Sequence, residues 1–299
     1  MDVNGDGQLD ILSGSYSRQD RAMAGLFQVL YGKADGTFAK PVALNGTDEK
    51  PLILPGDSED TMTDRICTRP TAVDLDGDGK LDIVSGNFSG TFFLFAGEGK
   101  GRFSPQATPL RSGEKSLHVP MHSDPFFVDW DKDGDLDLLS GSAQGGVYYA
   151  ENTGSKTKPA FQAFAEMMAP AGHHSEAQVT SDDEHLTAPG SSTRVWADDV
   201  DGDGDLDLLI GDQVELIHPA EGVDLATAQK RFVEWEAQLA KLMEASPWKQ
   251  GEEPDPTAVE AWQKSYQELD QAMEKFAKRE NTGYVWLLKQ EKIVQGPVR

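Results

Sequence analysis

A nine-residue motif rich in aspartate occurs four times in this chain and limits the possible folds more than any other feature. The motif starts at residues 2, 74, 129 and 199 of the 299, so successive copies lie 72, 55 and 70 residues apart. The second copy reads Asp-Leu-Asp-Gly-Asp-Gly-Lys-Leu-Asp, and every copy leads into a mostly apolar run that ends in glycine. Self-similarity at this spacing predicts a repeated supersecondary unit rather than a short solenoid repeat.

Each complete repeat has the composition of four short β-strands. An apolar stretch precedes the motif, the run just described follows it, an aromatic run comes next, and a Gly-rich turn leads to a fourth stretch. We name these strands A, B, C and D in chain order, so the motif is the turn between A and B. Four short antiparallel strands per repeat, separated by glycines, are typical of a β-propeller blade. The sequence therefore predicts an all-β fold, a β-propeller with four blades visible in this chain.

The fourth repeat is interrupted after strand B by a segment with a helical pattern. Apolar residues recur three and four positions apart in residues 224–243 and again in residues 256–279. Asp224 and Asp255 are suitable N-caps, and Pro256 suits the first helical position. We therefore predict an inserted antiparallel α-helical hairpin. The expected domains are blades 1 to 4 in residues 1–217, the hairpin in residues 218–282, and the final propeller strand or strands in residues 283–299.

The composition of the motif predicts a calcium site in each copy. Side-chain oxygens at positions 1, 3, 5 and 9 surround one point, position 7 can add its backbone carbonyl, and water completes the shell that calcium requires. Glycine at position 6 permits the positive φ that folds the loop back on itself, and the leucine at position 8 is expected to anchor the loop in the blade core. We expect about four Ca²⁺ sites. Their residues are Asp2, Asn4, Asp6, Gln8, Asp10, Asp74, Asp76, Asp78, Lys80, Asp82, Asp129, Asp131, Asp133, Asp135, Asp137, Asp199, Asp201, Asp203, Asp205 and Asp207.

Other metal-binding motifs fit less well. The EF-hand shares the first half of the motif, but it requires a glutamate at position 12 and flanking helices. This chain has Ser13, Ser85, Ser140 and Ile210 at that position, between predicted strands. The motif contains no histidine or cysteine for zinc, and magnesium rarely occupies an all-protein oxygen cage. A single loop of this kind could be an ordinary hairpin turn, but four full copies favour the calcium interpretation.

The motif resembles the FG-GAP and VCBS repeats of integrin-α-like propellers, in which an Asp-x-Asp-Gly-Asp-Gly-x-Leu-Asp loop joins strands A and B. The resemblance covers nearly all of the chain outside the helical hairpin. It implies an extracellular or cell-envelope location and a role in adhesion or in the recognition of a protein or glycan. Propellers of this family usually have more blades, so we expect these four to be part of a larger propeller.

The charge of the chain argues against two classes of partner. The formal net charge is −24, and four divalent cations would cancel eight of these charges. The remaining acidity disfavours nucleic acid and anionic membranes as partners, and no apolar run is long enough to span a bilayer. Met1 lies where other repeats have the last residue of strand A. We therefore expect an internal or trimmed start with an open sheet edge, and any export signal to lie upstream.

Residues outside the motif are candidates for ligand binding. Strand parity places the A–B and C–D turns on one face of the blades and the D–A and B–C connections on the other, and long, varied loops usually carry recognition. Arg65 and Arg69 precede a strand A, where they could contact an anionic ligand or pair with local acids. The ligand residues expected on this second face are His122, His173, His174, Arg194 and Trp196.

Three functions are compatible with this organisation. We expect a non-enzymatic recognition or adhesion module, because the sequence has neither a nucleophile elbow nor an identifiable acid–base pair. The alternative is a calcium-dependent polysaccharide-active enzyme, a lyase or hydrolase, on a propeller scaffold. A third possibility is that the propeller is a scaffold and that the helical hairpin binds a partner protein.

Overall fold

A computed structural model describes residues 1–16, 26–55, 65–170, 179–181, 183, 186–248 and 254–290. The chain forms two compact units. The first comprises Met1–Ala171, Pro189–Asp212 and Tyr284–Arg299, and the second comprises Gly172–Ala188 and Gln213–Gly283. Strand β15 (Asp207–Pro219) runs from the first unit into the second.

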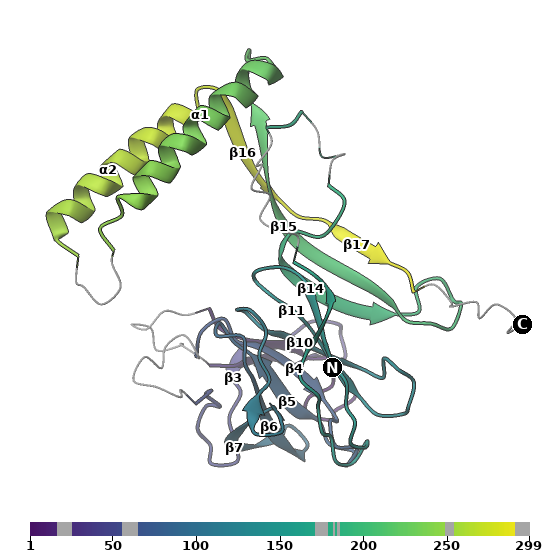
Figure 1. Ribbon diagram of the computed structural model, residues 1–299. Helices are drawn as coiled ribbons and strands as arrows, with labels where there is room; N and C mark the ends of the chain where they lie inside the picture. Colours follow the sequence, from purple (N-terminus) through teal and green to yellow (C-terminus); the bar gives the residue numbers. More distant parts are fainter. Residues whose placement is uncertain are drawn as a thin grey trace, which may run out of the picture. The chain divides into compact units, whose positions relative to one another are not determined.

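The first unit consists of four small antiparallel sheets, which are the predicted blades (Figure 1). Blade 1 has three strands, β1 (Ile11–Ser13), β2 (Gln28–Leu30) and β3 (Val42–Ala43). Blade 2 contains β4 (Arg69–Val73), β5 (Asp82–Gly86), β6 (Phe92–Gly99) and β7 (Arg102–Pro109). Blade 3 contains β10 (Asp124–Val128), β11 (Asp137–Gly141), β12 (Val147–Ala150) and β13 (Ala165–Met168). Blade 4 contains β14 (Ser191–Asp198), the first part of β15, and β17 (Val285–Leu288).

The predicted fold class is therefore confirmed, and membership of a larger propeller stays a prediction. A short ribbon, β8 (Arg111–Ser112) with β9 (Lys115–Ser116), follows blade 2. In blade 1, strand A is absent from the described residues, and its sheet has the order β1-β2-β3.

Each A–B pair is a tight antiparallel hairpin closed by one aspartate-rich loop. In blade 2 the register runs from Arg69↔Gly86 at the far end to Val73↔Asp82 beside the loop. The C–D turn of blade 2, at Gly101, lies against Asn4 in the loop of blade 1. The loops and the C–D turns therefore share one face of the blades, as strand parity predicts.

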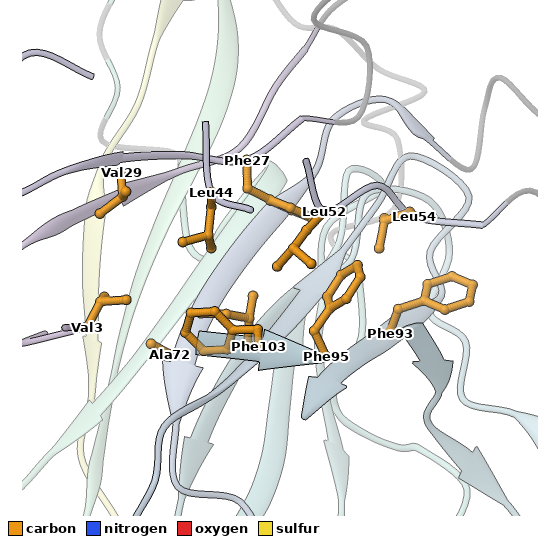
Figure 2. Close-up of a cluster of buried hydrophobic side chains, with 11 residues drawn as sticks. Val3, Phe27, Val29, Leu44, Leu52, Leu54, Ala72, Phe93, Phe95 and Phe103 are labelled. Atoms are coloured by element: carbon orange, nitrogen blue, oxygen red, sulfur yellow. The ribbon is translucent and has the colours of Figure 1, made fainter. Parts of the chain in front are cut away.

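Neighbouring blades bury apolar side chains between their sheets. Figure 2 shows Phe27, Val29 and Leu44 of blade 1 pointing toward Phe95 and Phe103 of blade 2. The rings of Phe27 and Phe95 meet edge to face, with centroids 5.7 Å apart. A similar cluster of buried apolar residues lies between blades 2 and 3, and another lies between blades 3 and 4. Most of the core of this unit therefore lies between blades, so a single blade could not be stable alone.

A hydroxyl residue joins each blade to the one before it. Six residues before the loops of blades 2, 3 and 4, the side chains of Thr68, Ser123 and Thr193 are buried. Each accepts a backbone N–H from the preceding blade, namely Ser15 at 2.7 Å, Asn87 at 2.9 Å and Ser142 at 2.9 Å. We call this contact the hydroxyl clasp.

The clasp explains the glycine that ends strand B in blades 1, 2 and 3. A Cβ at Gly14, Gly86 or Gly141 would overlap the backbone carbonyl oxygen of the clasp residue in the next blade. The residues just before the clasp, Cys67, His122 and Ser192, all have a left-handed φ between 50° and 54°. These non-glycine conformations carry backbone strain, which the clasp and the blade packing offset.

The second unit is a β-ribbon that carries the helical hairpin. The end of β15 pairs with β16 (Ala277–Thr282), and two helices lie between them, α1 (Leu225–Glu244) and α2 (Pro256–Met273). The predicted N-caps are present, because Asp224 accepts the N–H of Thr227 at 2.9 Å and Asp255 accepts that of Thr257 at 3.0 Å. Neither described helix combines the length and the hydrophobicity needed to cross a membrane.

The structure differs from the predicted insertion at the end of the second helix. The helical pattern was extended to residue 279, but α2 ends at Met273 and β16 begins at Ala277. Phe276 is buried against Ile217 and Ala277 instead of continuing the helix. Strand β16 has the sequence Ala-Lys-Arg-Glu-Asn-Thr, which lacks apolar alternation, so only its backbone pairing with β15 makes it a strand.

Candidate cation-binding loops and ligand-binding surface

Each loop is shaped by the same three bonds between side chain and backbone. In blade 2, Gly79 N donates to Asp74 Oδ2 at 3.1 Å, Asp78 N to Asp76 Oδ1 at 3.2 Å, and Lys80 N to Asp78 Oδ1 at 2.9 Å. The other three loops repeat the bonds from positions 6 to 1, 5 to 3 and 7 to 5. The side chains at positions 1, 3 and 5 therefore surround the turn that they stabilise.

Left-handed residues allow the loop to close. The glycines at position 6 have φ between 84° and 99°, as predicted. Position 4 is also left-handed, at Gly5, Gly77, Lys132 and Gly202. Sequence reasoning missed this second position because a lysine occupies it in blade 3.

The aspartate at position 9 connects its loop to strand C. In blade 3, Asp137 is 1 % exposed and accepts bonds from Trp130 N at 3.1 Å, Asn152 N at 2.7 Å and the Tyr149 hydroxyl at 3.2 Å. Asp10, Asp82 and Asp207 each accept one N–H within the loop and one at the end of strand C. The role of this side chain as a cation ligand stays a prediction, and the structure gives it a structural role in every blade.

The loop carboxylates are close enough to share an ion. In three loops, one oxygen from each of three aspartates lies within 4.8 Å of the others. In addition, Asp74 Oδ1 and Asp129 Oδ1 are buried and have no hydrogen-bond partner among the described residues. Buried carboxylate oxygens without a donor are unfavourable unless a cation compensates them, so the donor set fits a hard divalent cation. The three groups are Asp74, Asp76 and Asp78; Asp129, Asp131 and Asp133; and Asp199, Asp201 and Asp207.

Three lysines partly neutralise the carboxylates of two loops, those of blades 2 and 4. Lys80 pairs with Asp78 in its own loop, and its ammonium holds the pKa of Asp78 below the usual range. Lys132 reaches from the loop of blade 3 to Asp205 and to the Gly204 carbonyl oxygen at 2.7 Å in the loop of blade 4. Lys289 donates to Asp201 at 3.0 Å. The sequence did not show the contacts of Lys132 and Lys289, because they join different parts of the chain.

Burial acts in the opposite direction on several loop carboxyls. It raises the pKa of Asp82, Asp135 and Asp137, and nearby loop carboxylates add to this shift. Asp135, at position 7 in blade 3, is 7 % exposed and its Oδ1 has no hydrogen-bond partner among the described residues. A bound cation would relieve this repulsion.

The leucine at position 8 is packed between blades in some of the four loops but not in all of them. Leu81 and Leu136 pack against the clusters between blades, but Leu9 is 73 % exposed. The expectation was therefore wrong for Leu9, which lies in blade 1. The face of a blade that carries this leucine packs against the preceding blade, and the described residues contain no blade before the first.

Two rows of side chains cross the A strands, an ionic row at the ends of β4 and β10 remote from the loops and an aromatic row two residues closer to the loops. Five residues before each loop, Asp124 of β10 lies between Arg69 of β4 at 3.8 Å and Arg194 of β14 at 3.2 Å. Three residues before each loop, the rings of Phe126 and Trp196 lie 4.9 Å apart. We call these five residues the A-strand surface. Burial raises the pKa of Asp124 to about 6, and the Arg69 guanidinium opposes this shift.

The structure brings together two of the predicted ligand residues. Arg194 and Trp196 lie two positions apart on one strand, and Trp196 is 55 % exposed. His122 lies two residues before Asp124, its ring meets that of Phe88 at an angle of 57° with centroids 4.7 Å apart, and burial lowers its pKa. His173 and His174 lie outside the described residues. Sequence reasoning missed Asp124, although its offset from the loop matches that of Arg69 and Arg194.

These features define a class of protein, a β-propeller whose A–B turns are aspartate-rich loops. Residues 74–140, which run from the loop of blade 2 into blade 3, match the family described as FG-GAP-like repeat. The resemblance noted from the motif is therefore confirmed. No curated protein matches the chain.

Solved structures that are similar to part of the chain include one from a bacterial toxin. It is the structure of the Photorhabdus luminescens Tc holotoxin pore, with 18 % sequence identity and a TM-score of 0.35. The match covers 63 % of this chain and 7 % of that chain. A likeness of this size does not bear on the function of this chain.

Proposed function

We propose that the chain is a calcium-stabilised, non-enzymatic recognition module that binds a protein or a glycan. The observation that carries the proposal is the common architecture of the four loops. Each loop fixes three oxygen-bearing side chains around one turn, and two loops bury a carboxylate oxygen that has no donor among the described residues. The arrangement of the three side chains recurs in every blade, which is expected of a stabilising site and not of a single catalytic centre.

Calcium would be held mainly by positions 1, 3, 5 and 9. The position-7 carbonyl and water would complete the shell, and the ion would neutralise carboxylates that otherwise repel one another. An ion that binds only the folded state adds about 2.7 kcal/mol of stability per site at a hundredfold excess over Kd. Extracellular modules that bind calcium weakly rely on the high calcium concentration outside cells. We therefore also propose an extracellular or cell-envelope location.

Recognition is proposed for the side of the blades remote from the loops. The ionic row of the A-strand surface lies there with partly exposed side chains, and the exposed Trp196 follows two residues after Arg194. Calcium would then act by fixing the blades and not by touching the ligand.

Chelation tests the calcium role directly. The purified chain is melted in excess chelator and again after calcium is restored, with metal content measured in both samples. We expect the melting temperature to fall by many degrees in chelator and to recover fully with calcium. Magnesium should not restore it to a comparable extent. An unchanged melt in a sample shown to be calcium-free would refute the proposal.

A further inference from the structure

The A-strand surface is a local exception in an acidic chain. Arg69 and Arg194 carry two positive charges against one negative charge on Asp124, while the formal net charge of the chain is −24. Arg194 is the more accessible arginine, with 39 % of its side chain exposed. Its Nη1 donates to the Thr193 carbonyl at 2.7 Å, which fixes the direction of the guanidinium.

The neighbourhood of this row has unused donors. Arg65 Nε and Arg69 Nη1 are buried N–H groups without a hydrogen-bond partner among the described residues, although Arg69 Nη1 lies 3.8 Å from Asp124 Oδ2. His122 Nε2 is a buried ring nitrogen that also has no partner there. Their backbone segments are joined, because Phe88 N donates to Ile66 O at 2.9 Å and His122 N donates to Phe88 O at 2.9 Å. Unpaired buried donors are costly, and an anion that entered this region would offset that cost.

The aromatic row lies directly beside the ionic row. Trp196 follows Arg194 by two residues on β14, and Phe126 follows Asp124 by two residues on β10, so each pair lies on one side of its strand. The exposed Trp196 offers a flat apolar face next to guanidinium donors and a carboxylate acceptor. A ring that carries both hydroxyl groups and a carboxylate matches this mixture. An acidic peptide would use the arginines but would leave the aromatic face and Asp124 without a role.

We propose that the A-strand surface binds an acidic saccharide, with the carboxylate of the sugar at Arg194 and Arg69 and its ring stacked on Trp196. This inference rests on the recognition role proposed above and names the ligand class of that surface. Neither calcium nor a covalent step takes part in the contact.

The test is calorimetric titration of the calcium-loaded chain with three probes. These are a hyaluronan octasaccharide, the neutral sugar maltoheptaose and polyglutamate. We expect the hyaluronan fragment to bind and maltoheptaose to bind at least about tenfold more weakly. Any affinity for polyglutamate should be unchanged by Trp196→Ala. Removal of one charge-assisted contact lowers affinity by roughly tenfold or more.

Two variants and two matched controls assign the site. Arg194→Gln and Trp196→Ala should each weaken hyaluronan binding at least about tenfold. Arg111→Gln, on the exposed ribbon after blade 2, and Trp248→Ala, with an indole 50 % exposed, should not. Calcium-dependent melts must be unchanged in all four, and any variant that melts early is replaced by Arg194→Lys or Trp196→Leu.

The outcomes separate this inference from the recognition role. Equal binding of hyaluronan by the variants and the controls, or no binding of hyaluronan, overturns the acidic-saccharide site. Polyglutamate binding that depends on Arg194 with no hyaluronan binding makes the site one for acidic peptides. In each case an intact calcium-dependent melt leaves the calcium role standing, whereas its loss refutes that role regardless of the probes.

Discussion

The aspartate at position 9 has two separable functions, and Asp137 is the best place to measure them. Substitution by alanine removes the acceptor for Trp130 N, Asn152 N and the Tyr149 hydroxyl. A buried donor left without a partner costs about 1–3 kcal/mol. The Asn152 bond is buried and the other two are partly buried, so we expect Asp137→Ala to cost about 3–5 kcal/mol of unfolding free energy.

This loss should persist when no calcium is bound. In excess chelator we expect the midpoint of thermal unfolding of Asp137→Ala to fall by on the order of 10 °C below that of the parent chain. The matched control is Asp133→Asn in the same loop. Asp133 is exposed and accepts one bond, from Asp135 N at 3.1 Å, which an asparagine can also accept.

The unfolding free energy of Asp133→Asn should therefore lie within about 1 kcal/mol of that of the parent in chelator. The variant should be less stable than the parent only when calcium is present. Differential scanning calorimetry compares each of the two variants with the parent, once in chelator and once in calcium. If Asp137→Ala matched the parent in chelator and lost stability only in calcium, position 9 would be a ligand alone and the anchoring role would be wrong.

Three further predictions concern the blades. Gly86→Ala places a Cβ against the Ser123 carbonyl oxygen and should separate blades 2 and 3, which would appear as a loss of cooperative unfolding. The control Gly113→Ala places its Cβ in open space and should only strain a left-handed turn. Replacing Gln213–Gly283 with a short Gly/Ser linker should preserve the calcium-dependent melt, because Asp212 N already bonds the Tyr284 carbonyl at 3.1 Å; insoluble or non-cooperative protein would contradict this. The pKa of Asp124 is raised from 3.8 to about 6, so the folded state binds this proton more readily, and the associated stability is present at pH 4 and lost as the pH rises through about 6. Asp124→Asn should remove this part of the pH dependence, and identical pH profiles for variant and parent would refute the shift.

The sequence was sufficient for features that lie within one repeat. The loop, its position-6 glycine and its flanking strands are local, so four copies specify them without a structure. The helices were recognised from their periodicity and caps. The ribbon was missed because β16 is polar and depends on pairing with residues some sixty positions earlier.

Features that lie between repeats were not recognised, although their signal is in the sequence. Thr68, Ser123 and Thr193 share one offset from the loops, and Arg69, Asp124 and Arg194 share the next. Such offsets have no meaning until the blades are stacked, because a hydroxyl that bonds a neighbouring blade resembles any polar residue at the start of a strand. An alignment of the four repeats over the residues before each loop would have shown both rows.

The proposed calcium loops and the proposed ligand surface lie toward opposite ends of the same hairpins. In blade 3 the loop fixes one end of the β10–β11 register at Val128↔Asp137, and the other end at Asp124↔Gly141 carries the ionic row. A change in register at the loop would therefore move Asp124 relative to Arg69 and Arg194. If calcium strengthens ligand binding through this register, linkage requires the ligand to strengthen calcium binding by the same factor. Calcium titrations with and without saturating ligand measure that factor. A factor of one, with both bound, would mean that the hairpins are rigid without calcium and that calcium contributes to stability alone.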